Sequence, residues 1–175
     1  MGTIVNEENE VMPLITVITV VFNGADCIEC AIRSVLNQGY QNLQYIIIDG
    51  GSTDGTVDII RKYENHLYCW VSEWDRGISD AFNKGIALAT GDIVGILNAD
   101  DWYEANTLHE VAKIHRLYPQ HVVHGRLRYW TDAETPYYDV GGNDSLMERL
   151  MSVMHPTVFV PRCVYEHYGM FLLDY

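Results

Sequence analysis

Basic residues are scarce in this chain of 175 residues, because 11 Lys and Arg stand against 24 Asp and Glu. The net charge is −13 at pH 7 and the isoelectric point is near 4.7. A surface this acidic repels the phosphates of nucleic acids and is a poor match for anionic lipid headgroups. The composition therefore argues against nucleic acid as a partner.

Long apolar runs are also missing. No run approaches the roughly 20 residues that cross a bilayer, and residues 1–12 are acidic and polar, unlike a signal peptide. We expect a cytoplasmic protein, and a peripheral position at the inner face of the membrane stays open.

Cysteine is too rare for a zinc site. Cys27 and Cys30 form a C-x-x-C pair, but they fall on a predicted helix and no second pair completes a ligand set. Cys69 and Cys163 are isolated. We interpret all four as structural thiols.

The first two thirds of the chain alternate between buried strand patterns and amphipathic helix patterns. β-branched and apolar runs predict strands, and apolar residues at helical spacing predict helices between them. The strands are expected at residues 14–22, 43–49, 67–71 and 93–97, and the helices at 27–38, 56–63, 78–90 and 104–118. This order predicts an α/β fold with a mainly parallel sheet flanked by helices.

The pattern changes after Pro119. Strands are predicted at residues 121–131, 137–140 and 155–161, with a short helix at 145–151. We expect an arm over residues 1–12, an α/β half over 13–118 and a mixed, β-rich region over 119–175. The two halves are predicted to share one continuous sheet in one domain.

Two adjacent carboxylates, Asp100 and Asp101, follow the strand at 93–97. They should stand at the carboxyl edge of the sheet, where open α/β sheets bind ligands. Their repulsion is costly unless a cation lies beside them, and hard oxygen ligands favour Mg²⁺ or Mn²⁺ shared with phosphates. The alternative is an Asx turn or a helix cap.

Asp49 ends the second predicted strand and should open on the same edge. Its carboxylate can accept a hydrogen bond from a nucleobase or a ribose hydroxyl, while Gly50 and Gly51 let a ligand approach closely. The alternative is a local turn that caps the helix at Thr56.

Charged residues of both signs crowd the third loop and the helix after it. Asp80, Asn83 and Lys84 stand at i, i+3 and i+4 and so share one helix face, close to Arg76. Cations for phosphate and carboxylates for hydroxyls are typical of a pocket for a diphosphate sugar. A solvated charged face is the alternative.

His155 precedes a proline at the start of a late strand. It is a candidate third metal ligand or a group that contacts the leaving phosphate or the acceptor. A structural role is the alternative.

Two other classes of enzyme are disfavoured. Residues 22–26 offer one glycine where a dinucleotide fingerprint needs three, and a nucleotidyltransferase would also need a glycine-rich loop there. Residues 52–56 are similar to the phosphatase motif D-x-D-G-T, but Ser52 occupies the position of the nucleophile.

Four segments together resemble the nucleotide-binding half of family-2 glycosyltransferases. They are TVITVVFN at 16–23, IIDGGSTDGT at 47–56, SEWDRGISDAFNKG at 72–85 and LNADD at 97–101. The resemblance implies a GT-A fold, a nucleotide-diphosphate sugar donor, Mg²⁺ or Mn²⁺, and inversion at the anomeric carbon.

The resemblance also implies roles for individual residues. Phe22, Asn23 and Asp49 would line the nucleobase and ribose, Arg76 would lie near the diphosphate, Asp100 would meet the ribose or the sugar, and Asp101 would hold the metal. With the residues suggested by their own chemistry, the expected nucleotide-sugar site is Val20, Phe22, Asn23, Asp49, Arg76, Asp80, Asn83, Lys84 and Asp100, and the expected metal ligands are Asp101 and His155. In relatives a late Asp past a Gly-x-Phe segment acts as general base. Gly169–Phe171 is similar to that segment, so we expect the base beyond Tyr175 and the chain to be a truncated piece of a longer enzyme.

The sequence thus predicts a glycosyltransferase, with a glycan or a lipid-linked sugar as acceptor and a role in bacterial surface polysaccharide biosynthesis. The alternative is a nucleotide-sugar-binding domain without transfer activity. The donor sugar, the nucleobase, the linkage and the oligomeric state stay open.

Overall fold

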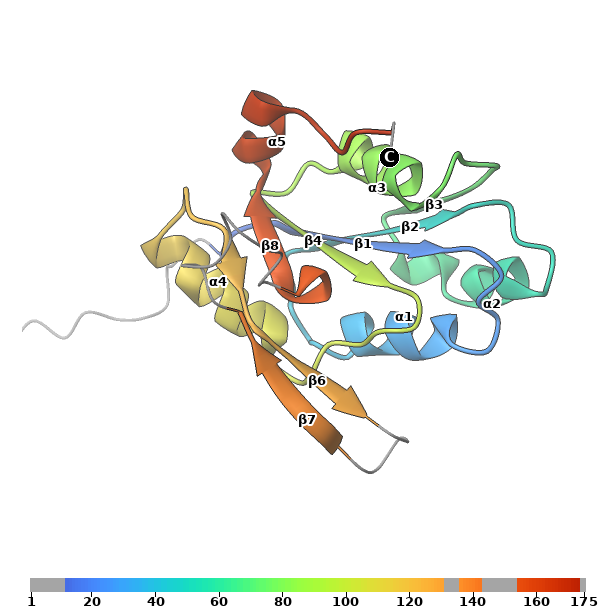
Figure 1. Ribbon diagram of the computed structural model, residues 1–175, viewed down its shortest axis with the longest axis horizontal. Helices are drawn as coiled ribbons and strands as arrows, with labels where there is room; N and C mark the ends of the chain where they lie inside the picture. Colours follow the sequence, from blue (N-terminus) through green and yellow to red (C-terminus); the bar gives the residue numbers. More distant parts are fainter. Residues whose placement is uncertain (1–11, 131–135, 143–153, 174–175) are drawn as a thin grey trace, which may run out of the picture.

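The computed structural model describes residues 12–130, 136–142 and 154–173. A six-stranded sheet runs through the molecule in the order β3-β2-β1-β4-β8-β5, and a two-stranded sheet, β6-β7, stands apart from it (Figure 1). Helices cover both faces of the larger sheet. The predicted α/β class and the mainly parallel sheet are therefore confirmed.

Four neighbouring strands of the large sheet are parallel, and they run from its edge inward: β3 (Cys69–Ser72), β2 (Leu43–Asp49), β1 (Ile15–Val21) and β4 (Ile93–Asn98). Every residue of β1 is buried. Continuous β-branched runs form such strands because helices cover both faces of the sheet and leave no side to the solvent.

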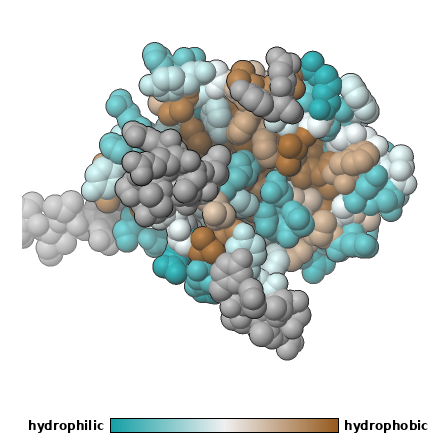
Figure 2. Space-filling view, in the orientation of Figure 1, coloured by the Kyte–Doolittle hydropathy of each residue, from teal (hydrophilic) through white to brown (hydrophobic). Residues whose placement is uncertain are grey.

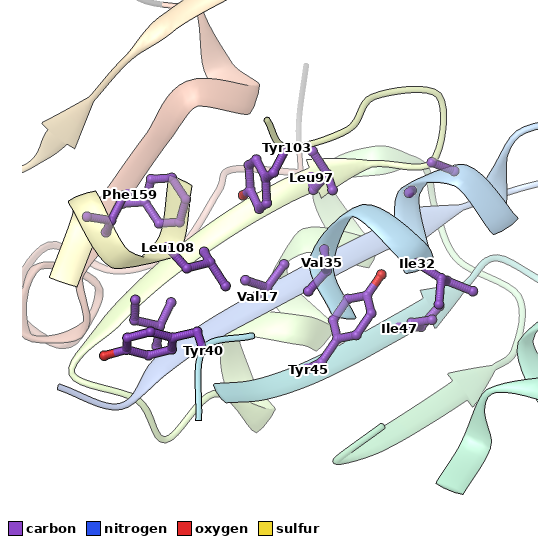
Figure 3. Packing of buried hydrophobic residues seen from close by; sticks show 14 of the residues in the cluster. Val17, Ile32, Val35, Tyr40, Tyr45, Ile47, Leu97, Tyr103, Leu108 and Phe159 are labelled. Carbon is purple, nitrogen blue, oxygen red and sulfur yellow. The ribbon is translucent and has the colours of Figure 1, made fainter. Parts of the chain in front are cut away.

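The helices divide between the two faces of the sheet. The first hydrophobic core contains residues of α1 (Ile28–Leu36), α2 (Thr56–Lys62) and α4 (Thr107–Leu117) (Figure 3). The second core lies on the other face under α3 (Ile78–Leu88), and α5 (Arg162–Tyr168) packs beside it. A one-turn helix, η1 (Glu64–His66), leads into β3.

The second half of the chain adds two strands to this sheet and forms a separate hairpin. β8 (Val158–Pro161) pairs antiparallel with β4, and the two-residue β5 (Val123–His124) pairs antiparallel with β8. β6 (Arg126–Trp130) and β7 (Pro136–Gly141) pair only with each other among the described residues. The single sheet predicted through both halves is therefore partly wrong, because the chain leaves the large sheet at Gly125.

A glycine allows β8 to lie close against β4. A Cβ atom added to Gly95 would lie 2.7 Å from Cδ1 of Phe159, a fully buried ring on β8. The predicted strand at 155–161 begins three residues later than expected, since His155–Thr157 form a 3-10 turn, η3.

Two sequence predictions lie outside the described residues: the helix at 145–151 and nearly all of the arm at 1–12. No helix within the described ranges is long and apolar enough to cross a membrane. Figure 2 shows apolar and hydrophilic side chains mixed over the visible face of the molecule.

Candidate functional site

The carboxyl ends of β1, β2 and β4 meet at one edge of the sheet. Val21 on β1 is aligned with Asp49 on β2, and Val20 is aligned with Asn98 at the end of β4. The chain turns directly after β4, where the N–H of Asp101 donates to the carbonyl of Asn98 at 3.1 Å. The prediction that Asp49 and Asp101 open on the same edge is confirmed.

A cleft of about 520 Å³ lies at this edge, and we call it the edge cleft. Its lining includes Val20, Phe22, Asn23 and Asp100, four residues that the sequence suggested for a nucleotide sugar. The Phe22 ring is 66% exposed, although large aromatic side chains usually lie inside a protein. The edge cleft therefore combines an open aromatic surface with amide and carboxylate groups.

Asp49 orders the loop that borders the edge cleft. Its buried carboxylate accepts hydrogen bonds from Ser72 Oγ at 2.6 Å, from the Ser52 N–H at 3.0 Å, from the Gly51 N–H at 3.2 Å and from Ser52 Oγ. Gly51 has φ +88°, a conformation that glycine adopts without strain. In this conformation the Asp49 carboxylate accepts hydrogen bonds from the loop that follows it. Direct contact between Asp49 and a nucleotide stays a prediction.

The loop after β1 is joined to the loop after β2 by side-chain hydrogen bonds. Asn23 Oδ1 accepts from the Thr53 N–H at 3.0 Å, and the Asn23 N–H donates to Ser52 Oγ at 2.7 Å. Asp54 accepts from the Ala25 N–H at 3.0 Å and from Thr56 Oγ1 at 2.6 Å. These bonds hold both loops in one position beside the edge cleft.

The hydrogen bonds to Asp54 lower the pKa of its carboxyl group, and the Thr56 hydroxyl is the largest cause. The alternative role considered for Asp49 was a local turn at the start of the helix at Thr56, but there it is Asp54 that accepts from the Thr56 N–H, at 3.0 Å. Ser52 and Asp54 were missed as positioning residues. The Asx-turn pattern of Asp54 two residues before Thr56 is the signal that was available.

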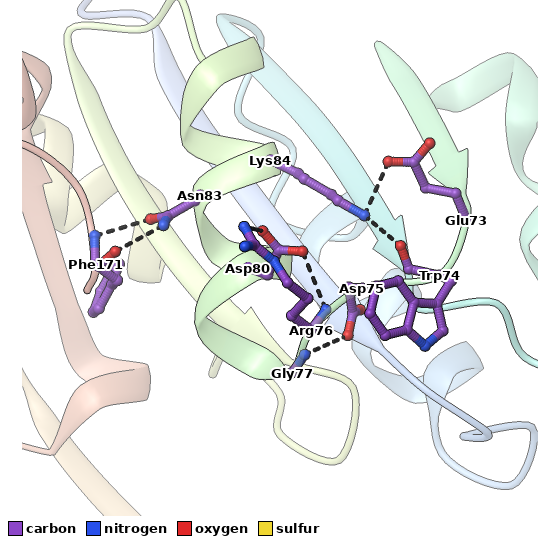
Figure 4. A network of polar contacts seen from close by, with 9 residues as sticks. All are labelled: Glu73, Trp74, Asp75, Arg76, Gly77, Asp80, Asn83, Lys84 and Phe171. Carbon is purple, nitrogen blue, oxygen red and sulfur yellow. Dashed lines mark hydrogen bonds and ion pairs between the residues drawn. The ribbon is translucent and has the colours of Figure 1, made fainter. Parts of the chain in front are cut away.

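Asp80, Asn83 and Lys84 of α3 each have a partner in this conformation (Figure 4). Asp80 accepts from the Arg76 N–H at 3.1 Å and from Arg76 Nη2 at 3.3 Å, and these contacts lower the pKa of Asp80. Lys84 Nζ lies 2.9 Å from Glu73 Oε1 and donates to the Trp74 carbonyl at 2.9 Å. The predicted contacts of this face with a diphosphate therefore stay predictions.

Asn83 faces a different part of the chain. Its Nδ2 donates to the Phe171 carbonyl at 2.8 Å, and its Oδ1 accepts from the Phe171 N–H at 2.9 Å. The segment after α5 is thereby held over α3 (Figure 1). The amide that the sequence suggested for a nucleotide sugar is occupied here by the backbone of a residue 88 positions away.

Asp101 is partly buried after β4. Burial raises the pKa of its carboxyl group, the charge of Asp100 raises it further, and a hydrogen bond from Asn98 Nδ2 at 3.3 Å opposes them. Oδ1 of Asn98 is buried and has no hydrogen-bond partner within the described structure. The carboxylate of Asp101 and the unpartnered amide oxygen of Asn98 are oxygen donors of the kind that a hard divalent cation takes, with its other oxygens from a ligand.

His155 lies in an aromatic cluster with Phe82 of α3 and Phe171. Its ring stacks on Phe82 with centroids 4.9 Å apart and lies 6.4 Å from the Phe171 ring. Burial lowers its pKa, which favours the neutral imidazole that metals require. Across the described ranges, no three His, Cys, Asp or Glu residues are grouped to hold a metal, so the pairing of Asp101 with His155 stays a prediction.

The sheet order and the edge cleft define an α/β protein of the glycosyltransferase GT-A fold. S. aureus TarS in complex with UDP superposes with a TM-score of 0.74 at 20% identity, over 91% of this chain and 50% of that chain. A mannosyltransferase of Pyrobaculum calidifontis in complex with GDP-Man and Mn²⁺ has a TM-score of 0.68 at 24% identity, over 94% of this chain and 49% of that chain. The expected fold is thus confirmed.

The family model described as glycosyl transferase family 2 matches residues 16–165, and the chain belongs to this family. An uncharacterized glycosyltransferase of Rickettsia typhi is 27% identical over 94% of this chain and 55% of its own length. The putative teichuronic acid biosynthesis glycosyltransferase TuaG of Bacillus subtilis is 37% identical over 55% of this chain and 39% of its own length. The chain spans about half, or less, of the length of these relatives.

Proposed function

We propose that this chain binds the donor of a glycosyltransferase that moves a sugar from a nucleotide diphosphate to an acceptor hydroxyl with inversion. The observation that carries the proposal is the edge cleft, where Phe22, Asn23 and Asp100 converge at the carboxyl ends of parallel strands. Membership of the family supports it, as do neighbours solved with UDP, UDP-GlcNAc and GDP-Man.

The nucleoside occupies the part of the edge cleft beside β1. The exposed Phe22 ring offers a stacking surface to the base, an interaction that is worth about 1–3 kcal/mol in other nucleotide sites. Asn23 and Val20 lie next to it, and Asp49 orders the neighbouring loop. Because these loops are already joined by hydrogen bonds, little conformational entropy is lost when the ligand binds.

A divalent cation, Mg²⁺ or Mn²⁺, is held by Asp101 together with Asn98 Oδ1, and His155 is the further candidate ligand. When bound, the ion neutralises the charge that develops on the departing diphosphate. The Mn²⁺ complex of the Pyrobaculum neighbour supports this assignment. Arg76 and Lys84 add positive charge on the α3 side, and Asp80 and Asn83 hold that face in place.

In the transfer step the acceptor oxygen forms a bond to the anomeric carbon while the bond to the diphosphate oxygen breaks on the opposite face. The configuration at that carbon therefore inverts. Asp100 is placed at the edge cleft, where it can accept hydrogen bonds from the ribose or the donor sugar. A general base takes the proton of the acceptor hydroxyl.

The acceptor is a glycan or a lipid-linked sugar of bacterial surface polysaccharide biosynthesis. Two relatives support this: TuaG, named for teichuronic acid biosynthesis, and the E. coli glucosyltransferase WfaP, named for a diphosphoundecaprenol-linked acceptor. WfaP is 33% identical over 53% of this chain and 37% of its own length. For a protein that acts on such acceptors we propose a cytoplasmic location, and a peripheral position at the inner face of the membrane stays open.

Calorimetry with UDP and GDP, each with and without Mn²⁺, tests the donor site. We expect binding that depends on Mn²⁺ and that weakens about ten-fold or more in Asp101→Asn, because the variant removes the anionic ligand of the cation. Asp58→Asn, an exposed carboxylate on α2, is the matched control and should bind as the wild type does. Equal affinity in Asp101→Asn and wild type would contradict the assignment.

A transfer assay separates the two candidate functions. Release of UDP or GDP from a nucleotide sugar in the presence of an acceptor supports the enzyme. Binding without release supports the alternative, a nucleotide-sugar-binding domain that lacks transfer activity.

A further inference from the structure

A second cavity of about 390 Å³ lies between the loop after β4, helix α4 and the β6-β7 hairpin, and we call it the hairpin cavity. Small-molecule sites in proteins typically measure roughly 300–1,000 Å³, so this volume suits a small ligand or one ring of a larger one. None of the roles assigned so far uses its hairpin side.

Two adjacent residues of the chain line different cavities. Asp100 lines the edge cleft, and the next residue, Asp101, lines the hairpin cavity. A ligand in the hairpin cavity therefore lies beside the carboxylate that we assign to the donor's cation. A donor in the edge cleft and a second ligand in the hairpin cavity would approach each other across this pair.

Aromatic rings form one wall of the hairpin cavity. Trp102 follows Asp101, Trp130 ends β6, and the two ring centroids lie 6.1 Å apart. Trp102 is 40% exposed, so a large part of its indole is open to a ligand. The buried side chains of Phe159 and Leu97 add further apolar surface to the cavity lining. An open indole wall over an apolar floor is typical of sites that bind flat, partly apolar rings.

Hydrogen-bonding groups also line the cavity, next to the indoles. Arg128 Nε donates to Asp139 Oδ1 at 2.8 Å, and Arg128 Nη1 donates to Glu104 Oε1 at 3.4 Å. The guanidinium carbon of Arg128 also lies 5.9 Å from the centre of the Trp130 ring, which fixes the orientation of that indole. Each carboxylate keeps lone pairs that can accept from hydroxyl groups.

We propose that the hairpin cavity binds the terminal pyranose ring of the acceptor. A pyranose has a face of C–H groups, which stacks on the indoles of Trp102 and Trp130, and a rim of hydroxyls, which donate to Asp139 and Glu104. This inference rests on the proposed function and deepens it, because it names a sugar ring as the part of the acceptor that is recognised.

Saturation-transfer difference NMR on the 175-residue chain tests this proposal with three probes: methyl β-D-glucopyranoside, methyl N-acetyl-β-D-glucosaminide and n-hexanol. We expect saturation of the C–H protons of one pyranose face for at least one sugar. Trp130→Ala should weaken its binding about three- to ten-fold, since the variant removes most of one stacking surface. Trp130→Phe, which keeps an aromatic ring, should restore part of the binding.

Trp74→Ala is the matched control, because Trp74 is an exposed indole outside the hairpin cavity, and its sugar binding should equal that of the wild type. Equal sugar binding in Trp130→Ala, binding of hexanol alone, or no sugar binding to folded wild-type protein would overturn the proposal. UDP binding in Mn²⁺, measured on the same wild-type sample, reports the edge cleft separately. If the wild-type protein does not bind UDP in Mn²⁺, this result would count against the proposed function of the edge cleft and not against the proposal for the hairpin cavity.

Discussion

The edge cleft and the hairpin cavity adjoin each other but are held in different ways. Beside the edge cleft, the buried Asp49 accepts four hydrogen bonds, and the loops after β1 and β2 are joined through Asn23 and Asp54. Beside the hairpin cavity, the β6-β7 hairpin is held by the exposed ion pairs of Arg128 and by the contact between two indoles.

This difference has energetic consequences. A buried acceptor with several donors is expensive to disrupt, because each donor left unpaired costs about 1–3 kcal/mol. Exposed ion pairs contribute little, since water competes with them and salt screens them. The donor side is therefore pre-organised, whereas the hairpin side can adjust its position at low cost when a ligand enters the cavity.

Among these variants, removal of Asp49 should cause the largest loss of stability. It tests whether the loops beside the edge cleft are rigidly held. Asp49→Ala removes a buried carboxylate and leaves the partly buried hydroxyl and N–H groups of Ser52, Ser72 and Gly51 without that acceptor. We expect the free energy of unfolding in urea to fall by about 3 kcal/mol. Asp58→Ala, which removes an exposed carboxylate, should unfold as the wild type does, and equal stability of both variants would show that the Asp49 network is not rigid.

The aromatic cluster that contains His155 should respond to acid. Burial lowers the pKa of His155 below its ordinary value of 6.5, so the unfolded chain takes up a proton more readily than the folded chain. The stability that the neutral ring provides is complete above pH 6.5 and is lost as the pH falls through the folded pKa.

His155→Phe keeps a ring against Phe82 and removes the titration. Between pH 7.5 and pH 5.5 the urea midpoint of this variant should fall less than that of the wild type. Burial also lowers the pKa of His115, so a smaller fall remains in the variant. Parallel pH profiles for variant and wild type would mean that His155 does not titrate below its ordinary range.

Among these variants, removal of Arg128 should change the global stability least. It tests whether the β6-β7 hairpin opens locally without unfolding the rest of the protein. Arg128→Ala deletes the pairs with Asp139 and Glu104, and we expect the global urea midpoint to stay unchanged. Amide hydrogen exchange in β6 and β7 should become several-fold faster, because the hairpin opens locally more often. Arg126→Ala is the control on the same strand, and a shift of the global midpoint in Arg128→Ala would contradict an independently held hairpin.

Sequence reasoning succeeded where local pattern decides the outcome. The runs that became β1, β2 and β4 were recognised because strands buried on both faces are continuously apolar. It failed at residues 121–131, where two strands separated by Gly125 belong to different sheets. Nothing in the local pattern states which partner a short strand will find.

The candidate site shows the same division. Four suggested residues, Val20, Phe22, Asn23 and Asp100, do line the edge cleft, because all of them follow or end central strands. Asn83 was also suggested for the ligand, but its amide binds the backbone of Phe171. Ser72 was missed, since its role depends on a carboxylate at the end of the neighbouring strand β2, and Ser52 was missed although it lies three residues after Asp49 in the same loop.

The sequence by itself determined the α/β class, the family and the position of Asp101 after a buried strand, because periodicity and motif order are written in consecutive residues. Only the tertiary structure decided which polar side chains hold the protein together and which remain available to a ligand. That choice depends on hydrogen bonds between segments far apart in the chain, such as Ser72 to Asp49 and Asn83 to Phe171. The separation of Asp100 and Asp101 into two adjoining cavities was decided in the same way, by the packing of the hairpin beside the end of β4.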